Sequence, residues 1–477
     1  TAAFKGVRER ILMKNIAYAG ALAALIGMDT DVIRELTRKK FSKKKALLDS
    51  NEQAIAIGYD YAKKAFDCPL PVHLEPMDAT KDSILIDGNT AAGLGCVFAG
   101  ATVGAWYPIT PSTSLMEGFK SFCQKFRRDP ETKKNRYAII QAEDELAAIG
   151  MVIGASWAGA RAFTPTSGPG ISLMNEFIGL AYYAEIPAVI FDVQRAGPST
   201  GMPTRTQQCD LLLCAYASHG DTRHICLYPS DPREAFELAG KAFDLAERFQ
   251  TPVFVLSDLD IGMNDWMVPR LTWDDAYRPD RGKVLSAAEL EQATTFHRYR
   301  DVDGDGIPQR TLPGVHPKGA YFTRGSGHNE FGGYTEDADE YQEVIDRVAR
   351  KVQGAARAVP APVTRKAATA TTMGLITVGG CHAACMEAID EMAKDGIALD
   401  YLRVRGFPFG DEVRSFVEQH EVVFVVEQNR DAQLRSLLML ETGQAIGRFE
   451  SVRDYGGFPM SAHHVISGVK AKLEKAA

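Results

Sequence analysis

The chain has 477 residues, of which 45% are hydrophobic and 24% charged, and its formal net charge is −7 at pH 7. This length exceeds what one hydrophobic core usually organises, so we expect about two to four domains. The negative charge gives no general attraction to nucleic acid, and no stretch reaches the roughly 18 apolar residues that a membrane helix needs.

Eight cysteines are scattered along the chain, which fits a reducing cytoplasm better than a disulfide framework. Cys381 and Cys385 lie close together in CHAAC, but this is not the CxxC spacing typical of zinc or iron–sulfur ligands. On a helix the two thiolates could face one way, although a buried face of small residues is the simpler interpretation. We therefore expect a cytoplasmic protein with no metal cluster of its own and no secretory signal.

Residues 1–78 have the pattern of helices. Apolar positions recur at helical spacing in 11–28 and 51–66, and the stretch 30–41 follows a Thr or Asp cap. So short an all-helical piece is more typical of the tail of a domain than of a complete one. The proline-bearing stretch 69–78 is a predicted linker.

Residues 82–264 alternate short apolar runs with longer helical patterns. This alternation is expected of a parallel sheet covered by helices on both faces. One helix opens with Asp231 and Pro232, a cap followed by a proline at the first helical position. The predicted strands are 83–88, 137–141, 160–166, 187–194, 224–229 and 251–258.

Residues 265–370 are rich in Gly, Pro and Asp and show little periodicity, with one expected helix at 340–352. A long irregular connection in a compact protein usually has a function. The alternation of strands and helices resumes over 373–477, which we interpret as a second, smaller α/β domain.

Acidic residues follow the strand predicted at 137–141, where open α/β sheets bind their ligands. Glu145 opens an apolar helix, and Glu143 and Asp144 precede it. The helix dipole alone would explain acids in a first turn. The functional alternative is a carboxylate at the edge of an apolar cleft, which would exchange a proton with a heterocyclic nitrogen.

Arg195 ends the strand 187–194 and precedes a turn that contains Ser199 and Thr200. A guanidinium beside hydroxyl groups suits the capture of a carboxylate, and a structural salt bridge explains it equally well. Arg205 lies ten residues further along and could meet a second carboxylate.

Two further turns contribute hydroxyl groups and free amides. Thr110 lies in YPITPSTS, and Ser167 and Gly168 lie in TSGPG, which leads into a helix whose amides could bind an anion. Helix capping and turn formation explain most sequences of this kind, so neither motif is specific alone.

The stretch 301–306, DVDGDG, resembles the start of a calcium-binding EF-hand loop, but position 12 of that loop is Leu312 instead of Glu. GDG also begins the diphosphate and Mg²⁺ motif of thiamine diphosphate enzymes, but here it follows no strand and no Asn-Asn comes after it. We interpret it as a surface turn.

Together, YPITPS, AEDE, TSGPG and the glycine- and threonine-rich stretch 197–211 occur in the order found in α subunits of 2-oxoacid:ferredoxin oxidoreductases. Residues 82–264 resemble the pyrimidine-binding domain of that family. The region 373–477, with VEQN at 426–429, resembles its transketolase C-terminal-type α/β domain, and 1–78 resembles the helical tail of a fused γ domain whose glycine-rich first half is missing. GPSTGMPTRTQQCDL most resembles 2-oxoglutarate:ferredoxin oxidoreductases.

The resemblance implies a thiamine-diphosphate-binding fold in which Glu145 contacts N1′ of the aminopyrimidine. Protonation of N1′ favours the imino tautomer that deprotonates the thiazolium C2. The other residues implied at the cofactor are Pro108, Ile109, Ser167 and Gly168.

Thr110 and Arg195 match the family residues that hold the 2-oxocarboxylate end of the substrate. Ser199, Thr200 and Arg205 are weaker candidates for the distal carboxylate of 2-oxoglutarate.

The expected reaction is oxidative decarboxylation of 2-oxoglutarate to succinyl-CoA and CO₂, with coenzyme A as co-substrate and ferredoxin as electron acceptor; the reverse direction uses the same site. Without a usable GDG motif or clustered cysteines, the chain needs a β subunit for the diphosphate, its Mg²⁺ and a [4Fe–4S] cluster. We expect an α₂β₂ assembly with the cofactor between α and β, and the connector 265–370 is a candidate interface.

Two alternatives stay open: the same chemistry on another 2-oxoacid, of the branched-chain, aryl or pyruvate type, and a non-catalytic scaffold subunit. A nicotinamide enzyme is disfavoured, because no GxGxxG follows the first predicted strand.

Overall fold

The computed structural model describes residues 4, 6–75 and 77–476. Contacts between residues divide the chain into two compact units, Thr1–Asp82 and Ser83–Ala477. No helix among the described residues is both long and apolar enough to cross a membrane.

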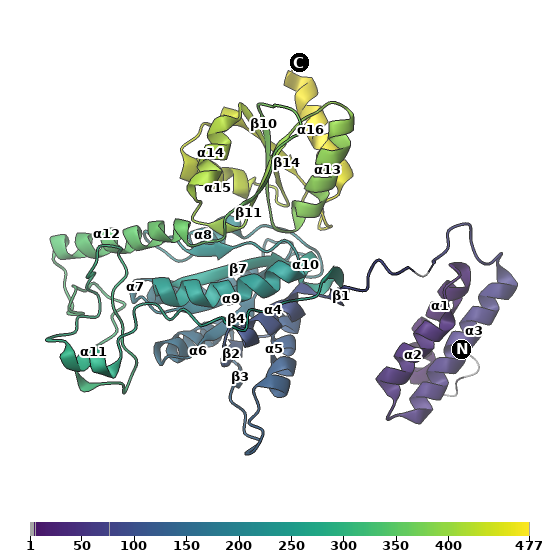
Figure 1. Cartoon of the computed structure of the whole chain (residues 1–477), viewed down its shortest axis with the longest axis horizontal. Coiled ribbons are helices and arrows are strands. Elements are labelled where there is room, and N and C mark those ends of the chain that lie inside the picture. Colours follow the sequence, from purple (N-terminus) through teal and green to yellow (C-terminus); the bar gives the residue numbers. More distant parts are fainter. Residues whose placement is uncertain (1–3, 5, 76, 477) are drawn as a thin grey trace. The chain divides into compact units, whose positions relative to one another are not determined.

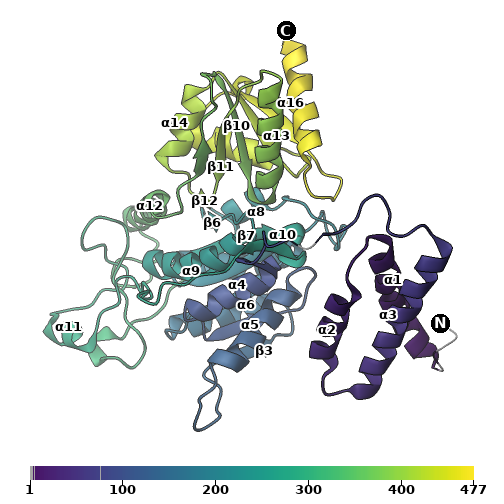
Figure 2. The ribbon, with the colours of Figure 1, turned by 45° about the vertical axis from the view of Figure 1, so that its right-hand side comes forward.

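The first unit consists of the helices α1 (Val7–Leu25), α2 (Thr30–Phe41) and α3 (Lys45–Ala65), of which α1 and α3 lie side by side in both ribbon views (Figures 1 and 2). Their backbones touch at two glycines. A Cβ on Gly20 would stand 2.1 Å from the Ile55 carbonyl oxygen, and one on Gly58 would stand 1.8 Å from the Ala17 oxygen. The range predicted for α2 is confirmed, whereas α3 begins at Lys45 instead of residue 51.

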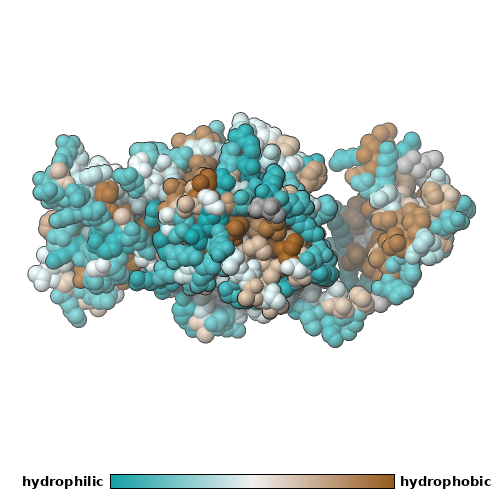
Figure 3. All heavy atoms as spheres, turned by 90° about the horizontal axis from the view of Figure 1, so that it is seen from above, coloured by the Kyte–Doolittle hydropathy of each residue, from teal (hydrophilic) through white to brown (hydrophobic). Residues whose placement is uncertain are grey.

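Apolar side chains remain at the surface of this helical unit. Figure 3 shows hydrophobic residues gathered on its visible face. Large exposed examples are Val7, Ile11, Leu12 and Tyr18 on α1 and Leu36 on α2.

The second unit contains a seven-stranded sheet with the order β12-β6-β7-β5-β4-β2-β3, in which every neighbouring pair except β12 and β6 is parallel. Its strands are β2 (Val103–Trp106), β3 (Ala138–Gln141), β4 (Ala162–Thr166), β5 (Ala188–Gln194), β6 (Ile225–Leu227), β7 (Pro252–Asp258) and β12 (Gly406–Phe407).

Helices cover both faces of this sheet, as predicted. One face packs under α4 (Gly88–Phe98), α5 (Thr113–Phe126) and α9 (Pro232–Phe249), whose buried residues form one apolar cluster with β5 and β7. The other face packs under α6 (Glu145–Trp157), α7 (Gly168–Tyr183) and α8 (Leu211–Ala215). The short helix α10 (Leu259–Met263) follows β7 directly.

A strand forms at Ser83–Ile86, within the predicted range 83–88, but it is not part of the parallel sheet, so only its predicted place in that sheet is wrong. β1 (Ser83–Ile86) pairs antiparallel with β8 (Trp266–Pro269) in a separate two-stranded sheet. The side chain of Leu85 is 72% exposed, whereas a strand inside a parallel sheet is buried on both faces. The place in the sheet belongs to β2, which sequence inspection missed.

The connector 265–370 carries β8, α11 (Ala287–Gln292), α12 (Ala338–Gly354) and β9 (Val363–Arg365) between irregular stretches. Buried charges attach it to the sheet domain. Lys351 Nζ donates to Glu185 Oε2 at 2.7 Å, and Arg347 of α12 holds both oxygens of the same carboxylate. Burial alone would raise the pKa of Glu185, but Arg347 and Lys351 lower it to about 2.

The C-terminal region forms a second sheet with the order β14-β13-β10-β11-β9. Its strands beyond β9 are β10 (Met373–Val378), β11 (Asp400–Val404), β13 (Val422–Glu427) and β14 (Phe449–Arg453), and its helices are α13 (His382–Lys394), α14 (Asp411–Gln419), α15 (Gln433–Thr442) and α16 (Ala462–Ala476). Sequence inspection missed β14 and α16.

The two sheets share one compact unit and stand next to each other in Figure 1. One apolar cluster contains both Ile190 of β5 and Ile376 of β10. Glu234 of α9 also accepts two hydrogen bonds from Arg403 of β11, at 2.6 and 2.8 Å. Burial would raise the pKa of Glu234, but Arg403 and Arg405 hold it at about 2. We keep the division at 82–264, 265–370 and 373–477 as a proposal for the domains.

Candidate active site

The motifs predicted to form a site follow four neighbouring parallel strands. YPITPS follows β2, Glu145 opens the helix after β3, TSGPG follows β4 into α7, and Arg195 follows β5. Because β3, β2, β4 and β5 are adjacent, their carboxyl ends lie along one edge of the sheet, where open α/β sheets place their ligands.

Glu145 is the first residue of α6 and is only 6% exposed. The adjacent Asp144 caps the helix by accepting the amide of Ala147 at 2.7 Å, so capping does not require Glu145. Within the described chain, no hydrogen bond or ion pair involves the Glu145 carboxyl group. Buried polar groups nearly always have a hydrogen-bond partner, so this arrangement is unusual. The Glu145 carboxyl group is therefore available to a ligand.

Gly170, in the first turn of α7, makes room for Glu145. A Cβ at this position would stand 1.9 Å from Thr166 Oγ1 and 3.0 Å from Glu145 Cγ. Gly170 of TSGPG and Glu145 of AEDE therefore lie against each other, although they are 25 positions apart in the sequence.

Arg195 is 7% exposed, and its Nη1 donates to the carbonyl oxygen of Thr110 at 2.7 Å. The buried Nε has no partner among the described residues. The fold thus brings Arg195 to Thr110 through the backbone of Thr110, and the role of both residues at the substrate carboxylate stays a prediction. The side chains of Thr110 and Pro108 are exposed, and Ile109 is half-buried.

The turn after Arg195 carries Ser199 and Thr200, both exposed. Arg205 is also exposed. Its Nη1 donates to the Thr204 carbonyl oxygen at 2.9 Å, and its guanidinium lies 5.3 Å from the ring centroid of Phe458. A distal-carboxylate role for Ser199, Thr200 and Arg205 stays a prediction.

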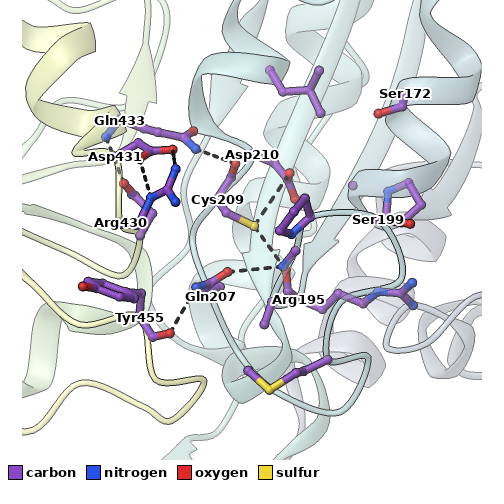
Figure 4. Close-up of a pocket in the computed structure, with 18 of the residues that line it drawn as sticks. Ser172, Arg195, Ser199, Gln207, Cys209, Asp210, Arg430, Asp431, Gln433 and Tyr455 are labelled. Carbon is purple, nitrogen blue, oxygen red and sulfur yellow. Dashed lines mark hydrogen bonds and ion pairs between the residues drawn. The ribbon is translucent and has the colours of Figure 1, made fainter.

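A cavity of about 920 Å³ lies between this turn, the start of α7 and the C-terminal sheet domain (Figure 4). Figure 4 shows Arg195, Cys209 and Asp210 on one wall and Arg430, Asp431 and Tyr455 on the other. Ser199 and Gly168 also line the cavity. The C-terminal sheet therefore contributes one wall of the cavity.

VEQN, at 426–429, fixes the segment that carries Asp210, a role that sequence inspection did not assign. The Gln208 amide donates to the Gln428 carbonyl oxygen at 2.9 Å, and Asn429 Nδ2 donates to the Gln208 carbonyl oxygen at 3.0 Å. Gln433 Nε2 donates to the Cys209 carbonyl oxygen at 2.7 Å. Polar groups between the end of β13 and the start of α15 thus hold the loop between β5 and α8 in place.

Sequence inspection also missed two buried aspartates at this edge. Asp192, inside β5, is fully buried, and Asp210 is 8% exposed. Burial raises the pKa of Asp210 to about 6, and burial and the negative charge of Asp210 raise the pKa of Asp192 well above its usual range. The two residues lie 18 positions apart in the sequence, so only the fold reveals the pair.

Asp210 also lies at the start of α7. Both of its carboxyl oxygens would be 2.8 Å from a Cβ on Gly168. Ser167, at the cap position, makes no side-chain capping bond, and its buried Oγ has no partner in the described chain. An internal carboxyl group thus stands beside the helix start that we expected to bind an external anion. The cofactor contacts of Ser167 and Gly168 stay predictions.

The DVDGDG stretch forms a turn whose acids are already occupied. Asp301 accepts the amides of Gly304 and Gly306 at 2.9 Å each. Lys283 Nζ donates to Asp303 at 2.7 Å and to Asp305 at 2.8 Å, so an internal cation stands where a metal ion would. In the part of the chain that the structure describes, these aspartates are the one group of three potential metal ligands that lie close together.

Cys381 and Cys385 are fully buried in an apolar cluster, as the simpler interpretation proposed. Burial raises the pKa of both thiols, so neither is a ready thiolate.

Comparison with known proteins found one family, one solved structure and several curated sequences that resemble this chain. The family described as "Pyruvate flavodoxin/ferredoxin oxidoreductase, thiamine diP-bdg" matches residues 94–281. A solved 2-oxoglutarate:ferredoxin oxidoreductase from Magnetococcus marinus, with 2-oxoglutarate, coenzyme A and succinyl-CoA bound, superposes with a TM-score of 0.85 at 28% identity. The match covers 98% of this chain and 79% of that chain.

Two curated relatives are similar in sequence. Subunit alpha of 2-oxoacid:ferredoxin oxidoreductase 2 from Aeropyrum pernix is 34% identical over 461 residues, which cover 94% of this chain and 70% of that protein. The 2-oxoglutarate synthase subunit KorA from Methanothermobacter thermautotrophicus is 31% identical over 368 residues, which cover 76% of this chain and 92% of that protein. The chain belongs to the α subunits of the 2-oxoacid:ferredoxin oxidoreductases, an oxidoreductase family with a thiamine-diphosphate-binding α/β domain.

Proposed function

We propose that this chain is the α subunit of a 2-oxoglutarate:ferredoxin oxidoreductase, which converts 2-oxoglutarate and coenzyme A into succinyl-CoA and CO₂ and passes electrons to ferredoxin. The observation that supports this most is the arrangement at the sheet edge. There the buried acid Glu145, which has no partner in the described part of the chain, lies on the same edge as the buried guanidinium of Arg195. The KorA relatives and the Magnetococcus structure support 2-oxoglutarate as the substrate.

Glu145 fits the aminopyrimidine ring of thiamine diphosphate because it is buried and its carboxyl group has no partner among the residues that the structure describes. When bound, thiamine diphosphate supplies the carbon that attacks the 2-oxo carbon and accepts the electrons left by decarboxylation. Glu145 would hold a proton at N1′ of the ring. Pro108, Ile109, Ser167 and Gly168 would line the same ring.

Arg195 would hold the carboxylate next to the 2-oxo group. Its Nη1 is fixed by the Thr110 carbonyl oxygen, and this contact orients the remaining N–H groups. A fixed guanidinium loses little freedom on binding and can form paired hydrogen bonds to a carboxylate. Among the candidates for the distal carboxylate, Ser199 is best supported because it lines the cavity; Thr200 and Arg205 are weaker.

The chain needs a partner for the rest of the reaction. A β subunit would hold the diphosphate, Mg²⁺ and a [4Fe–4S] cluster, and two αβ pairs would form an α₂β₂ assembly, with the connector 265–370 as a candidate interface. The relatives are named as alpha subunits, which supports a multi-subunit complex. We place this complex in the cytoplasm on the basis of its scattered cysteines.

Turnover of the reconstituted complex tests the proposal. The chain is co-purified with its partner, and steady-state rates are measured with 2-oxoglutarate, pyruvate and 2-oxoisovalerate. We expect kcat/KM for 2-oxoglutarate to exceed both others by at least about tenfold. Similar values for all three would instead support the broader 2-oxoacid specificity named for the Aeropyrum relative. Absence of turnover with every 2-oxoacid would support the scaffold alternative.

A further inference from the structure

The negative charge of the chain is concentrated in one short stretch of the connector. Residues 325–346 contain seven Asp and Glu residues and no Lys or Arg, and the formal net charge of the whole chain is −7, so the remaining residues together are neutral. The seven acids are Glu330, Glu336, Asp337, Asp339, Glu340, Glu343 and Asp346. Blocks of like charge repel one another and often take part in interactions with other molecules.

Few of these charges are compensated inside the protein. In the described part of the chain, Glu330 alone among the seven forms an ion pair, with Arg300 at 3.7 Å. The dipole of α12 explains the three acids in its cap and first turn. It does not explain Glu343 and Asp346, which are exposed further along the helix and have no ionic partner among the described residues.

A groove of about 530 Å³ lies among these acids, and we call it the acidic groove. One side of α12 and two loops of the connector form its walls. The two arginines at the groove already bind internal carboxylates, because Arg347 donates to Glu185 and Arg350 lies 3.2 Å from Asp301. The acidic groove therefore offers carboxylates without a free cation among its lining residues.

Aromatic side chains of the same stretch are also exposed. Phe331, Tyr334 and Tyr341 are all at least half exposed, and Phe331 lines the acidic groove. Aromatic faces attract cations, and the apolar stem of a lysine packs well against them. Acids and aromatic rings together fit a basic protein segment.

The chain itself contains a basic segment of matching charge. Residues 38–45, RKKFSKKK, hold six Lys and Arg residues and no acid, and they form the turn between α2 and α3. Two of the six pair with acids of the helical unit, at 2.6 and 2.9 Å. The other four are exposed and have no acidic partner among the described residues: Lys40, Lys43, Lys44 and Lys45.

Three of these lysines stand at the start of α3, where they oppose the helix dipole. The cap residue Lys44 makes no side-chain capping bond, and no acid lies in the first turn of the helix. Cations at a helix start are unfavourable, because the free amides there already carry partial positive charge. Carboxylates supplied by another molecule would remove this repulsion.

We propose that the acidic groove binds the basic turn 38–45 of a second copy of this chain. Each copy carries one groove and one turn, so a two-fold arrangement forms two equivalent contacts. Lysine ammonium groups of the turn pair with Glu340, Glu343 and Asp346, and their stems lie against the exposed aromatic rings. This inference goes beyond the proposed function and does not depend on the substrate; it supplies a contact between the two αβ pairs.

Two charge-reversed chains test the contact, each in complex with the partner subunit. The turn variant carries Lys43→Glu, Lys44→Glu and Lys45→Glu, and the groove variant carries Glu340→Lys, Glu343→Lys and Asp346→Lys. Either variant alone places like charges at both contacts, so the association of two copies should weaken by at least about tenfold in analytical ultracentrifugation at low salt. In an equal mixture, the reversed turn meets the reversed groove and the natural turn meets the natural groove, so association should return to that of the wild type.

Mixing the two variants separates the candidate occupants of the groove. If the groove binds the partner subunit, or the turn of its own copy, mixing restores nothing and the proposal is overturned. Association at the wild-type strength in each variant alone overturns it as well. The matched control is the set of exposed acids of and beyond α13, changed together as Glu387→Lys, Glu391→Lys and Asp395→Lys.

This control changes the net charge as much as the groove variant does and should associate like the wild type. Equal weakening in the control would show an effect of net charge alone and overturn the proposal. Thermal unfolding verifies that each variant is folded.

Cross-linking gives an independent measurement on the wild-type complex. A carbodiimide joins a lysine directly to a carboxylate in contact with it. In a mixture of isotope-labelled and unlabelled copies, peptides that join 43–45 of one copy to 340–346 of the other are expected, and their absence would contradict the contact. Absence of 2-oxoacid turnover would count against the proposed function alone.

Discussion

Replacing Gly170 with alanine should disable the site while leaving most of the fold in place. The added Cβ would stand 1.9 Å from Thr166 Oγ1 and 3.0 Å from Glu145 Cγ, so the neighbouring groups have to move by about 1 Å. Overpacking of this kind typically costs about 1–3 kcal/mol of unfolding free energy. A misplacement of about 1 Å at a reacting group can lower turnover about 10²-fold.

Gly154→Ala is the matched control for this variant. Gly154 lies in α6, the helix that Glu145 opens, and apart from the adjoining backbone of that helix none of the described residues comes within 4 Å of its added Cβ. It should keep wild-type turnover and gain roughly 0.5–1 kcal/mol, because alanine is the better helix former. Urea unfolding and steady-state turnover of the reconstituted complex are measured for both variants. Wild-type stability and turnover in Gly170→Ala would refute the packing argument.

Three further predictions concern the rest of the chain. Glu234 has a folded pKa of about 2, below its unfolded value, so its ion pairs contribute stability above about pH 4.5 that is lost as the pH falls toward 2. Glu234→Gln should therefore be about 3 kcal/mol less stable than the wild type at pH 7, and a gap that does not narrow in acid would contradict this. Lys351→Ala should cost about 3 kcal/mol in urea unfolding because it breaks a fully buried pair with Glu185, whereas the exposed Lys394→Ala should cost less than about 1 kcal/mol. Calcium, magnesium and EDTA should leave the Tm unchanged, because Lys283 already occupies the aspartate turn, and a calcium-dependent rise would show that a metal displaces it.

Much of the site could be predicted because its residues follow strands directly. The ends of β3, β4 and β5 carry Glu145, TSGPG and Arg195, and the parallel arrangement of the strands brings such positions together. The helical spacing and the capping residue in the sequence also predicted α2, and in the structure the side chain of Asp29 caps this helix by accepting the amide of Asp31.

The features that sequence inspection missed depend on contacts between distant segments. β2 has four residues and contains Gly104, so it shows neither a long apolar run nor alternation; its place in the sheet comes from pairing with β3 and β4. The pair of Asp192 and Asp210 joins the interior of a strand to a loop. VEQN acquires its role only when β13 lies beside that loop.

Arg205 has a contact that the local sequence could not predict. The fold places its guanidinium over Phe458, more than 250 residues away in the sequence, and its distal-carboxylate role stays a prediction. Ser199, from the same turn, lines the cavity instead.

The central claim is that Glu145 exchanges a proton with the cofactor ring. The most direct test is hydrogen–deuterium exchange at the thiazolium C2 of thiamine diphosphate bound to the reconstituted complex. Glu145→Gln should slow this exchange by about 10²–10⁴-fold with assembly and cofactor binding intact, whereas Gln at the exposed neighbouring position, Glu143→Gln, should leave it unchanged. Exchange at the wild-type rate in Glu145→Gln would contradict the account.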